Sequence, residues 1–206
     1  MKASDFLAML YFLAITAFLF FATDTFIAWT RAYPYLMGFA KVALLATFGE
    51  CLRHRISLGQ WLPDKVFLRF VVWGVFGVWF TAAFPFVDGG VKTIMAGNLW
   101  PDLWSSFSMS LWINLFSGYA FSMMLVHYWI DHMIKCGYFL EPWYMFSLHY
   151  GNGREWAKVV ILSIIFFWLP AHTFTFSLPP IWRVICAAYL AVFLGLILSF
   201  ATKRQK

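Results

Sequence analysis

Long apolar stretches separated by short polar connections make up most of this chain. Because the apolar core of a bilayer is about 30 Å thick, about 20 consecutive apolar residues predict a helix that crosses it. The second stretch contains Lys41 and ends at Glu50, so it is either a tilted, partly solvated helix or a complete span. With it included, the pattern predicts an all-α, polytopic bundle of about six transmembrane helices. The six stretches lie at about residues 6–23, 33–52, 67–87, 106–130, 157–178 and 181–201.

The composition supports a membrane protein and argues against a soluble domain. Of the 206 residues, 63% are hydrophobic and 12% are charged, against about 45–50% and 25% in soluble domains. No linker or polar domain interrupts the apolar stretches, so we expect a single integral membrane domain over residues 1–206, with the lipid bilayer as its partner. The stretch 6–23 lacks a small-residue cleavage site before Asp24, so we expect it to be a retained helix and not a signal peptide.

The basic residues predict how the bundle is oriented. With the N-terminus in the cytoplasm, eleven of the 15 lysines and arginines fall on that side, which is the asymmetry that orients membrane helices. Both termini are therefore expected to be cytoplasmic. This topology accounts for the net charge of +6, so the charge does not indicate a nucleic-acid partner. The remaining four basic residues are Arg31, Lys41, Lys92 and Arg183.

Two longer connections contain aromatic and polar residues typical of the membrane interface. Residues 88–106 predict a turn followed by an interfacial segment, and residues 134–158 predict a segment along the cytoplasmic face. The three cysteines are far apart and form no disulfide or metal-binding motif. We expect no cofactor and no metal.

Ionisable residues inside membrane helices are costly and are therefore functional candidates. Glu50 precedes Arg53 and His54 at helical spacings that favour an ion pair at the cytoplasmic end of its helix. Lys41 lies on the opposite side of that helix, and it either extends to the outer surface or faces a polar interior.

The fourth stretch contains a second polar group. His127 and Asp131 lie one helical turn apart, next to His132. They form a pH-sensitive gate, a structural hydrogen bond near the cytoplasmic rim or, with His132, part of a metal site. Asn114, with Ser108 and Ser110, is expected to hydrogen-bond to neighbouring helices.

The sequence "FFWLPAHTFTFSLPPIWRV" of residues 166–184 places polar residues inside an apolar stretch. Pro170 should kink the fifth helix and free the carbonyl of Phe166. A freed acceptor in lipid needs a donor, which His172, Thr173 and Thr175 can supply. These residues either serve only the kink or line a pore.

The same sequence predicts how the fifth helix ends and the sixth begins. Pro179 and Pro180 should end one helix, because proline disfavours helical geometry in the residue before it. Arg183 then opens the last helix, and we expect it to act as an anchor whose side chain reaches the outer headgroups.

These residues resemble the last hairpin of the Mpv/peroxisomal-membrane-protein family, in particular its bacterial branch. The segment 33–50, ending in Gly49-Glu50, and the "HYWID" of residues 127–131 are similar to two further motifs of that family. The resemblance covers about residues 33–200, so the helix at 6–23 is an addition. The spacing of the two prolines is shorter than in the eukaryotic pattern, and His172 and Thr175 or their neighbours replace an expected Gln and Asn. The residues that carry the hairpin resemblance are Trp168, Pro170, Thr173, Phe176, Pro179 and Arg183.

The resemblance implies a non-enzymatic channel for small solutes or ions in a bacterial plasma (inner) membrane. Our hypothesis is a helical bundle, able to self-associate, whose pore is lined by the second, fourth and fifth helices. A membrane scaffold or helper protein is one alternative. A membrane-embedded lipid-modifying enzyme is another, although no nucleophile with a base is evident. The pore-lining or gating candidates are His172, Thr173, Thr175, Pro170, His127, Asp131, Glu50, Lys41 and Asn114.

Overall fold

The computed structural model describes residues 3–101, 103–137 and 153–203, and the surroundings of side chains as far as residue 196. All regular secondary structure within these residues is helical, which confirms the all-α prediction. The chain divides into two compact units. Unit 1 comprises residues 1–84 and 180–206, and unit 2 comprises residues 85–179.

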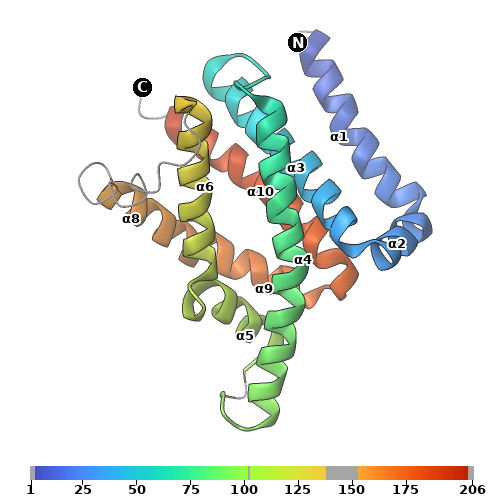
Figure 1. Ribbon diagram of the computed structural model, residues 1–206, viewed down its shortest axis with the longest axis vertical. Helices are drawn as coiled ribbons and strands as arrows, with labels where there is room; N and C mark the ends of the chain where they lie inside the picture. Colours follow the sequence, from blue (N-terminus) through green and yellow to red (C-terminus); the bar gives the residue numbers. More distant parts are fainter. Residues whose placement is uncertain (1–2, 102, 138–152, 204–206) are drawn as a thin grey trace. The chain divides into compact units, whose positions relative to one another are not determined.

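Unit 1 is built around one central helix. The helix α3 contains nine buried residues, and α10 lies alongside it (Figure 1). The short α2 lies between α1 and α3 in the sequence and also contacts α3. The elements of unit 1 are α1 (Ala3–Phe21), α2 (Thr23–Ala32), α3 (Pro34–Leu58), the first part of α4 (Val66–Ala96) and α10 (Pro180–Lys203).

Glycines allow the helices of unit 1 to approach one another closely. A Cβ atom on Gly195 of α10 would lie 2.9 Å from the carbonyl oxygen of Gly49 in α3. A Cβ atom on Gly77 of α4 would collide with the carbonyl oxygen of Gly38 in α3. Close packing of small residues is how membrane helices associate, because burial away from lipid gives little hydrophobic gain.

The helix α1 packs on α3 and α10 but has no buried residue. Tyr11 donates a hydrogen bond from its hydroxyl to the carbonyl of Leu44 at 3.1 Å, and the hydroxyls of Thr16 and Tyr189 lie 2.9 Å apart. The remaining surface of α1 is apolar and suits contact with lipid. Its exposed large side chains are Phe6, Leu7, Met9, Leu10, Tyr11, Leu13, Phe18, Phe20 and Phe21.

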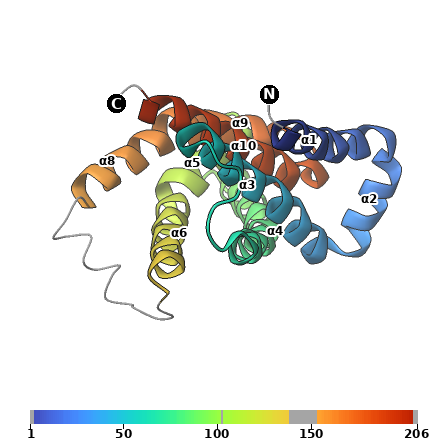
Figure 2. The same ribbon diagram turned by 90° about the horizontal axis from the view of Figure 1, so that it is seen from above.

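Unit 2 contains two interrupted helices. The helices α5 and α9 lie side by side, and α6 contacts α8 (Figures 1 and 2). The axis bends by 50° between η1 and α6, where Gly118 adopts a φ of 67° that favours glycine. The elements after α4 are α5 (Ser105–Leu111), η1 (Trp112–Phe116), α6 (Tyr119–Cys136), α8 (Gly153–Ser163), η2 (Ile164–Trp168) and α9 (Leu169–Ser177).

Four helical segments are long and apolar enough to cross a membrane within the described part of the chain. They are Ala3–Phe21, Pro34–Leu58, Val66–Ala96 and Gly153–Ser177, and the bent pair Ser105–Phe116 and Tyr119–Cys136 would make a fifth. The helix α10 adds an apolar stretch over Pro180–Leu196. These are the helices of a membrane protein, and each coincides with one of the six apolar stretches.

The structure corrects the interpretation of residues 88–106. Helix α4 does not end near residue 87 but continues to Ala96, through Pro85 and two glycines. An ion pair of 2.9 Å between Lys92 and Asp88, four residues apart, supports this extension. The turn begins only at Gly97. Of the connection 134–158, residues 138–152 lie outside the described part of the chain.

The proline-rich segment 166–184 is helical except for a short break at Leu178 and Pro179. Residues Gly153–Ser177 form one continuous helix whose middle section is a π-helical turn, directly before Leu169 and Pro170. As expected, the helix ends just before the double proline, and α10 begins at Pro180. Proline suits the first turn of a helix because its missing N–H has no intrahelical acceptor there.

Candidate functional site

Two π-helical turns from different helices meet in unit 2. In η1 the N–H of Ser117 donates to the carbonyl of Trp112, and in η2 the N–H of Leu169 donates to the carbonyl of Ile164. Both bonds span five residues, one more than in an α-helix. The two turns contact each other. Such wide turns are rare and often occur at functional sites.

A buried polar pair lies at this junction. The Nδ2 atom of Asn114 is 3.0 Å from Nδ1 of His172, and its Oδ1 is 3.1 Å from the same nitrogen. The amide can therefore donate to a neutral imidazole or accept from its N–H, according to the tautomer. The Asn114 and His172 side chains are 3% and 8% exposed. Trp168 stacks on the His172 ring at 5.1 Å between centroids.

Hydroxyl groups surround the Asn114–His172 pair. Ser110 Oγ donates to the carbonyl of Leu169 at 2.6 Å, and Thr173 Oγ1 donates to the same carbonyl at 2.8 Å. Thr175 Oγ1 donates to the carbonyl of Ala171 at 2.9 Å. The expectation of bonds to a neighbouring helix is thus confirmed for Asn114 and Ser110, whereas Ser108 accepts from Trp100 in the connection before α5.

The hydroxyls reach different acceptors from the one expected. We predicted that Pro170 would free the carbonyl of Phe166, whereas the hydroxyls of Thr173 and Thr175 bond to carbonyls four residues before them in α9. Both are the bonds that a threonine inside a helix ordinarily makes to the carbonyl one turn before it, so they do not depend on Pro170. No periodicity signal in the sequence marks either π turn.

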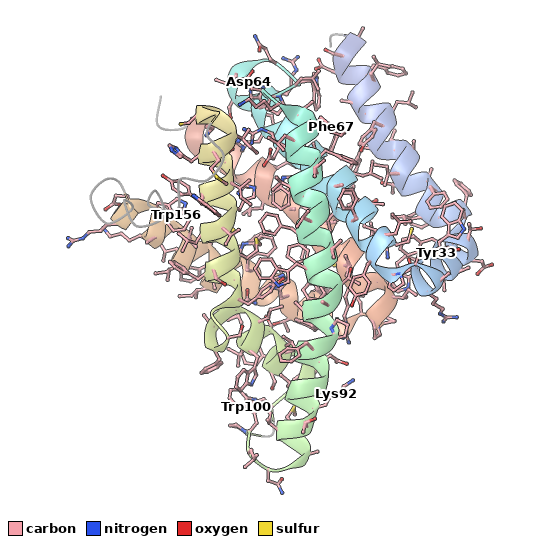
Figure 3. All side chains as sticks on the ribbon, in the orientation of Figure 1. Tyr33, Asp64, Phe67, Lys92, Trp100 and Trp156 are labelled. Carbon is pink, nitrogen blue, oxygen red and sulfur yellow. The ribbon has the colours of Figure 1, made fainter. Side chains whose placement is uncertain are left out.

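The indole of Trp100 lies beside the serines and π turn of this site, and the sequence did not predict it there. Trp100 lies in the connection between α4 and α5 (Figure 3). Its Nε1 donates to Ser108 Oγ at 3.1 Å, and its ring packs against Trp112 and Phe116 of η1. From the sequence, residues 88–106 predicted only a turn and an interfacial segment. The indole therefore packs on η1 and is hydrogen-bonded to one serine of α5.

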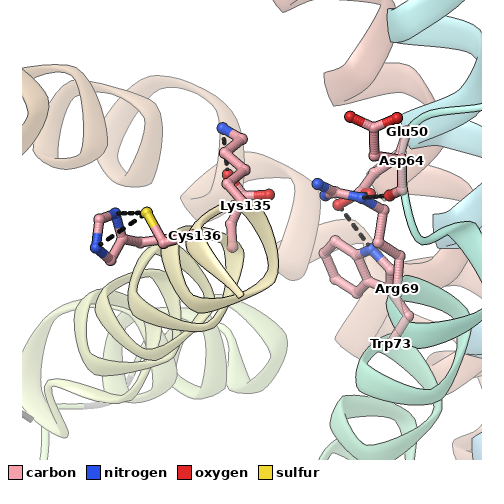
Figure 4. A network of polar contacts seen from close by, with 8 residues as sticks. Glu50, Asp64, Arg69, Trp73, Lys135 and Cys136 are labelled. Carbon is pink, nitrogen blue, oxygen red and sulfur yellow. Dashed lines mark hydrogen bonds and ion pairs between the residues drawn. The ribbon is translucent and has the colours of Figure 1, made fainter. Parts of the chain in front are cut away.

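Unit 1 holds a separate buried network around Glu50 (Figure 4). Arg69 Nη1 donates to Glu50 Oε2 at 3.1 Å, and Trp73 Nε1 donates to Glu50 Oε1 at 3.0 Å. The expected pairing of Glu50 with Arg53 and His54 is therefore wrong. Arg53 is exposed, and His54 Nδ1 lies 2.7 Å from the carbonyl of Gln60.

Lys41 points into the protein. Its Nζ donates to Thr30 Oγ1 of α2 at 2.8 Å and lies 4.4 Å from the centroid of the Phe26 ring. Only 5% of Lys41 is exposed, so of the two alternatives the interior position is correct. Arg183 was expected to reach the headgroups, but it is 7% exposed, so its side chain is buried in the structure.

The proposed gate residues lie on α6. Asp131 forms an ion pair of 2.7 Å with Lys135, one turn further along, and His127 is half-buried. Cys136 Sγ lies 3.6 Å from both ring nitrogens of His132 (Figure 4). Within the described residues, no three His, Cys, Asp or Glu side chains are grouped closely enough to hold a metal ion.

The structure thus brings together the candidates of the fourth and fifth stretches, Asn114, His172, Thr173 and Thr175, in unit 2. Glu50 and Lys41 belong to separate clusters in unit 1. Helices of this length and composition, with polar side chains paired between them, define the class as an all-helical membrane protein. Comparisons with protein-family models, with curated proteins and with solved structures give no match.

Proposed function

We propose that this chain is a channel for small solutes or ions, related to the Mpv/peroxisomal-membrane-protein family and located in a bacterial inner membrane. In this proposal it crosses the membrane six times, with both termini in the cytoplasm, and functions without catalysis. The observation that carries the proposal is the hydrogen-bonded pair of Asn114 and His172 between two π-helical turns.

The cost of this arrangement supports a function for it. Burying an amide and an imidazole in an apolar bundle is unfavourable unless each finds hydrogen-bond partners. Here the partners come from two helices that both depart from α-helical geometry at the same place. A tightly packed structural core would achieve the same stability with apolar residues and regular helices.

The chemistry of the cluster indicates the kind of solute. Its side chains are serine and threonine hydroxyls, an amide and an imidazole, and it holds no carboxylate, lysine or arginine among the described residues. Such groups can exchange hydrogen bonds with a passing solute but offer no strong fixed charge. We therefore expect small polar solutes to pass with weak selectivity.

The test is solute flux into liposomes that contain the purified full-length protein. We expect Asn114→Leu and His172→Phe each to reduce the flux of a small polyol at least tenfold, because each removes one side of the polar pair. His54→Phe is the matched control, since that histidine bonds to the carbonyl of Gln60 in a connection of unit 1. It should leave flux unchanged.

One result would overturn the channel itself, and two others would exclude the residues proposed to line or gate it. Liposomes that stay silent, with insertion and orientation verified, would favour a scaffold protein. Equal flux in the wild type, Asn114→Leu and His172→Phe would show that the solute path does not pass the Asn114–His172 pair. The gate hypothesis for α6 is tested in the same liposomes across pH 5–8, and unchanged permeation in the double variant His172→Phe, Asp131→Asn would exclude both sites.

A further inference from the structure

A second buried polar site lies in unit 1, at the junction of α2 and α3, and it is separate from the Asn114–His172 pair that carries the proposed channel. The short α2 places Phe26 and Thr30 one turn apart, so both face α3. Lys41 of α3 reaches toward them, with its Nζ 2.8 Å from Thr30 Oγ1 and 4.4 Å from the centre of the Phe26 ring. Trp182 of α10 stacks on Phe26 at 5.1 Å between centroids.

This site contains hydrogen-bond donors without matching acceptors. An ammonium group has three N–H donors, and in the described structure one goes to Thr30 while the ring face of Phe26 attracts the charge. The oxygen of Thr30 accepts the bond from Lys41, and its own proton has no acceptor among the described residues. The Lys41 ammonium and the Thr30 hydroxyl therefore each have an N–H or O–H without an acceptor at the same place.

The charge of Lys41 also has no local counterpart. Unit 1 has four acids, and in the described structure none pairs with Lys41. Asp5 binds Arg55 and Trp61, Glu50 binds Arg69 and Trp73, and Asp24 is exposed. Asp64 is exposed as well, and only its backbone carbonyl accepts from Arg69. A buried cation without an opposite charge is unfavourable, and an anion beside it would offset that cost.

We propose that Lys41 and Thr30 bind a small monovalent anion, of the size of chloride, between α2 and α3. The anion accepts the spare N–H of Lys41 and the O–H of Thr30, and it neutralises the buried charge. The aromatic rings of Phe26 and Trp182 close the site on the side of α10, which favours a compact ion over a bulky one. The bound anion also fixes α2 on α3.

The test is thermal unfolding of the full-length protein in detergent, in chloride and in gluconate at one ionic strength. A ligand that binds only the folded state raises the melting temperature with its concentration. We expect chloride, but not gluconate, to raise the melting temperature of the wild type. Lys41→Met should abolish the increase, and Thr30→Val should raise the half-saturating chloride concentration at least tenfold.

Two outcomes would refute the anion site. One is an equal chloride response in the wild type and Lys41→Met, and the other is a wild type with no preference for chloride over gluconate. Lys92→Met is the control, because Lys92 is exposed and paired with Asp88 on α4, and it should keep the full response. The assay needs no transport, so its result is independent of the channel proposal.

Discussion

At the scale of single residues, the Glu50–Arg69 pair is the most demanding interaction in unit 1. The two side chains are 12% and 7% exposed and join α3 to α4. Removing one member of a buried ion pair leaves the other charge without compensation, at a cost of about 3–5 kcal/mol. We therefore expect Arg69→Met to lower the melting temperature in detergent strongly.

The double variant separates the pair from general packing. In Glu50→Gln, Arg69→Met the buried charge is gone and Trp73 can still donate to the amide oxygen, so stability should exceed that of Arg69→Met alone. If the double variant lost as much stability as Glu50→Gln and Arg69→Met added together, the two side chains would not be energetically coupled. Lys92→Met, at an exposed ion pair, should cost about 1 kcal/mol or less.

Sequence reasoning identified Glu50 as important but assigned it the wrong partners. The helical spacing rule sees only neighbours on the same helix, here Arg53 and His54. The actual partner, Arg69, lies 19 residues further along the chain and meets Glu50 only because α3 and α4 pack together. Asn114 and His172, 58 residues apart, were likewise named singly, and their pairing depends on how α5 and α9 pack.

At the scale of helices, the α3–α4 crossing depends on the absence of a side chain at Gly77. A Cβ atom there would collide with the Gly38 backbone and would lie 2.8 Å from Val42 Cβ. Alanine normally stabilises a helix relative to glycine by about 1 kcal/mol. We expect Gly77→Ala to destabilise the protein instead, by about 1–3 kcal/mol, because an overpacked crossing must move apart.

The same helix provides the control for this substitution. Apart from the adjoining backbone of its own helix, no heavy atom in the described structure lies within 4 Å of a Cβ atom built on Gly89. Gly89→Ala should therefore raise the melting temperature slightly, by the helix-propensity gain of about 1 kcal/mol or less. Equal shifts in the two variants would mean that the crossing does not require glycine.

The six apolar stretches located the long helices, but not all of their features. The ten-residue α2 was missed because a short, polar helix does not produce a long apolar stretch. The end of α4 was placed too early because Gly89 and Gly90 resemble a turn, whereas the Lys92–Asp88 pair continues the helix. The π turns leave no mark in apolar periodicity, since Asn114 is the one polar residue in the two turns.

At the scale of the whole molecule, the division into two units could not be read from the sequence. Unit 1 joins the beginning of the chain to its last helix, because α10 returns to pack along α3. That contact depends on Gly49 and Gly195, which are ordinary glycines in the sequence. The number of membrane crossings is a different question, which the distribution of charge addresses.

The bent pair formed by α5–η1 and α6 is the decisive element for topology, because it is either one crossing or a re-entrant loop. With six crossings, eleven lysines and arginines lie on one side and four on the other. If the bent pair does not cross the membrane, every later segment changes side, and the lysines and arginines divide nine to six between the two sides. The stronger asymmetry favours a complete crossing.

Reporter fusions that are active on only one side of the membrane test this topology. We expect fusions after Leu62 and at the C-terminus to report the cytoplasm, and a fusion after Asn98 to report the opposite side. A C-terminal fusion on the same side as Asn98 would mean an odd number of crossings, and a fusion after Gly137 on that side too would make the bent pair re-entrant. In that case Asn114 would lie in a loop that enters the membrane from one face, whereas His172 would stay on the crossing helix Gly153–Ser177.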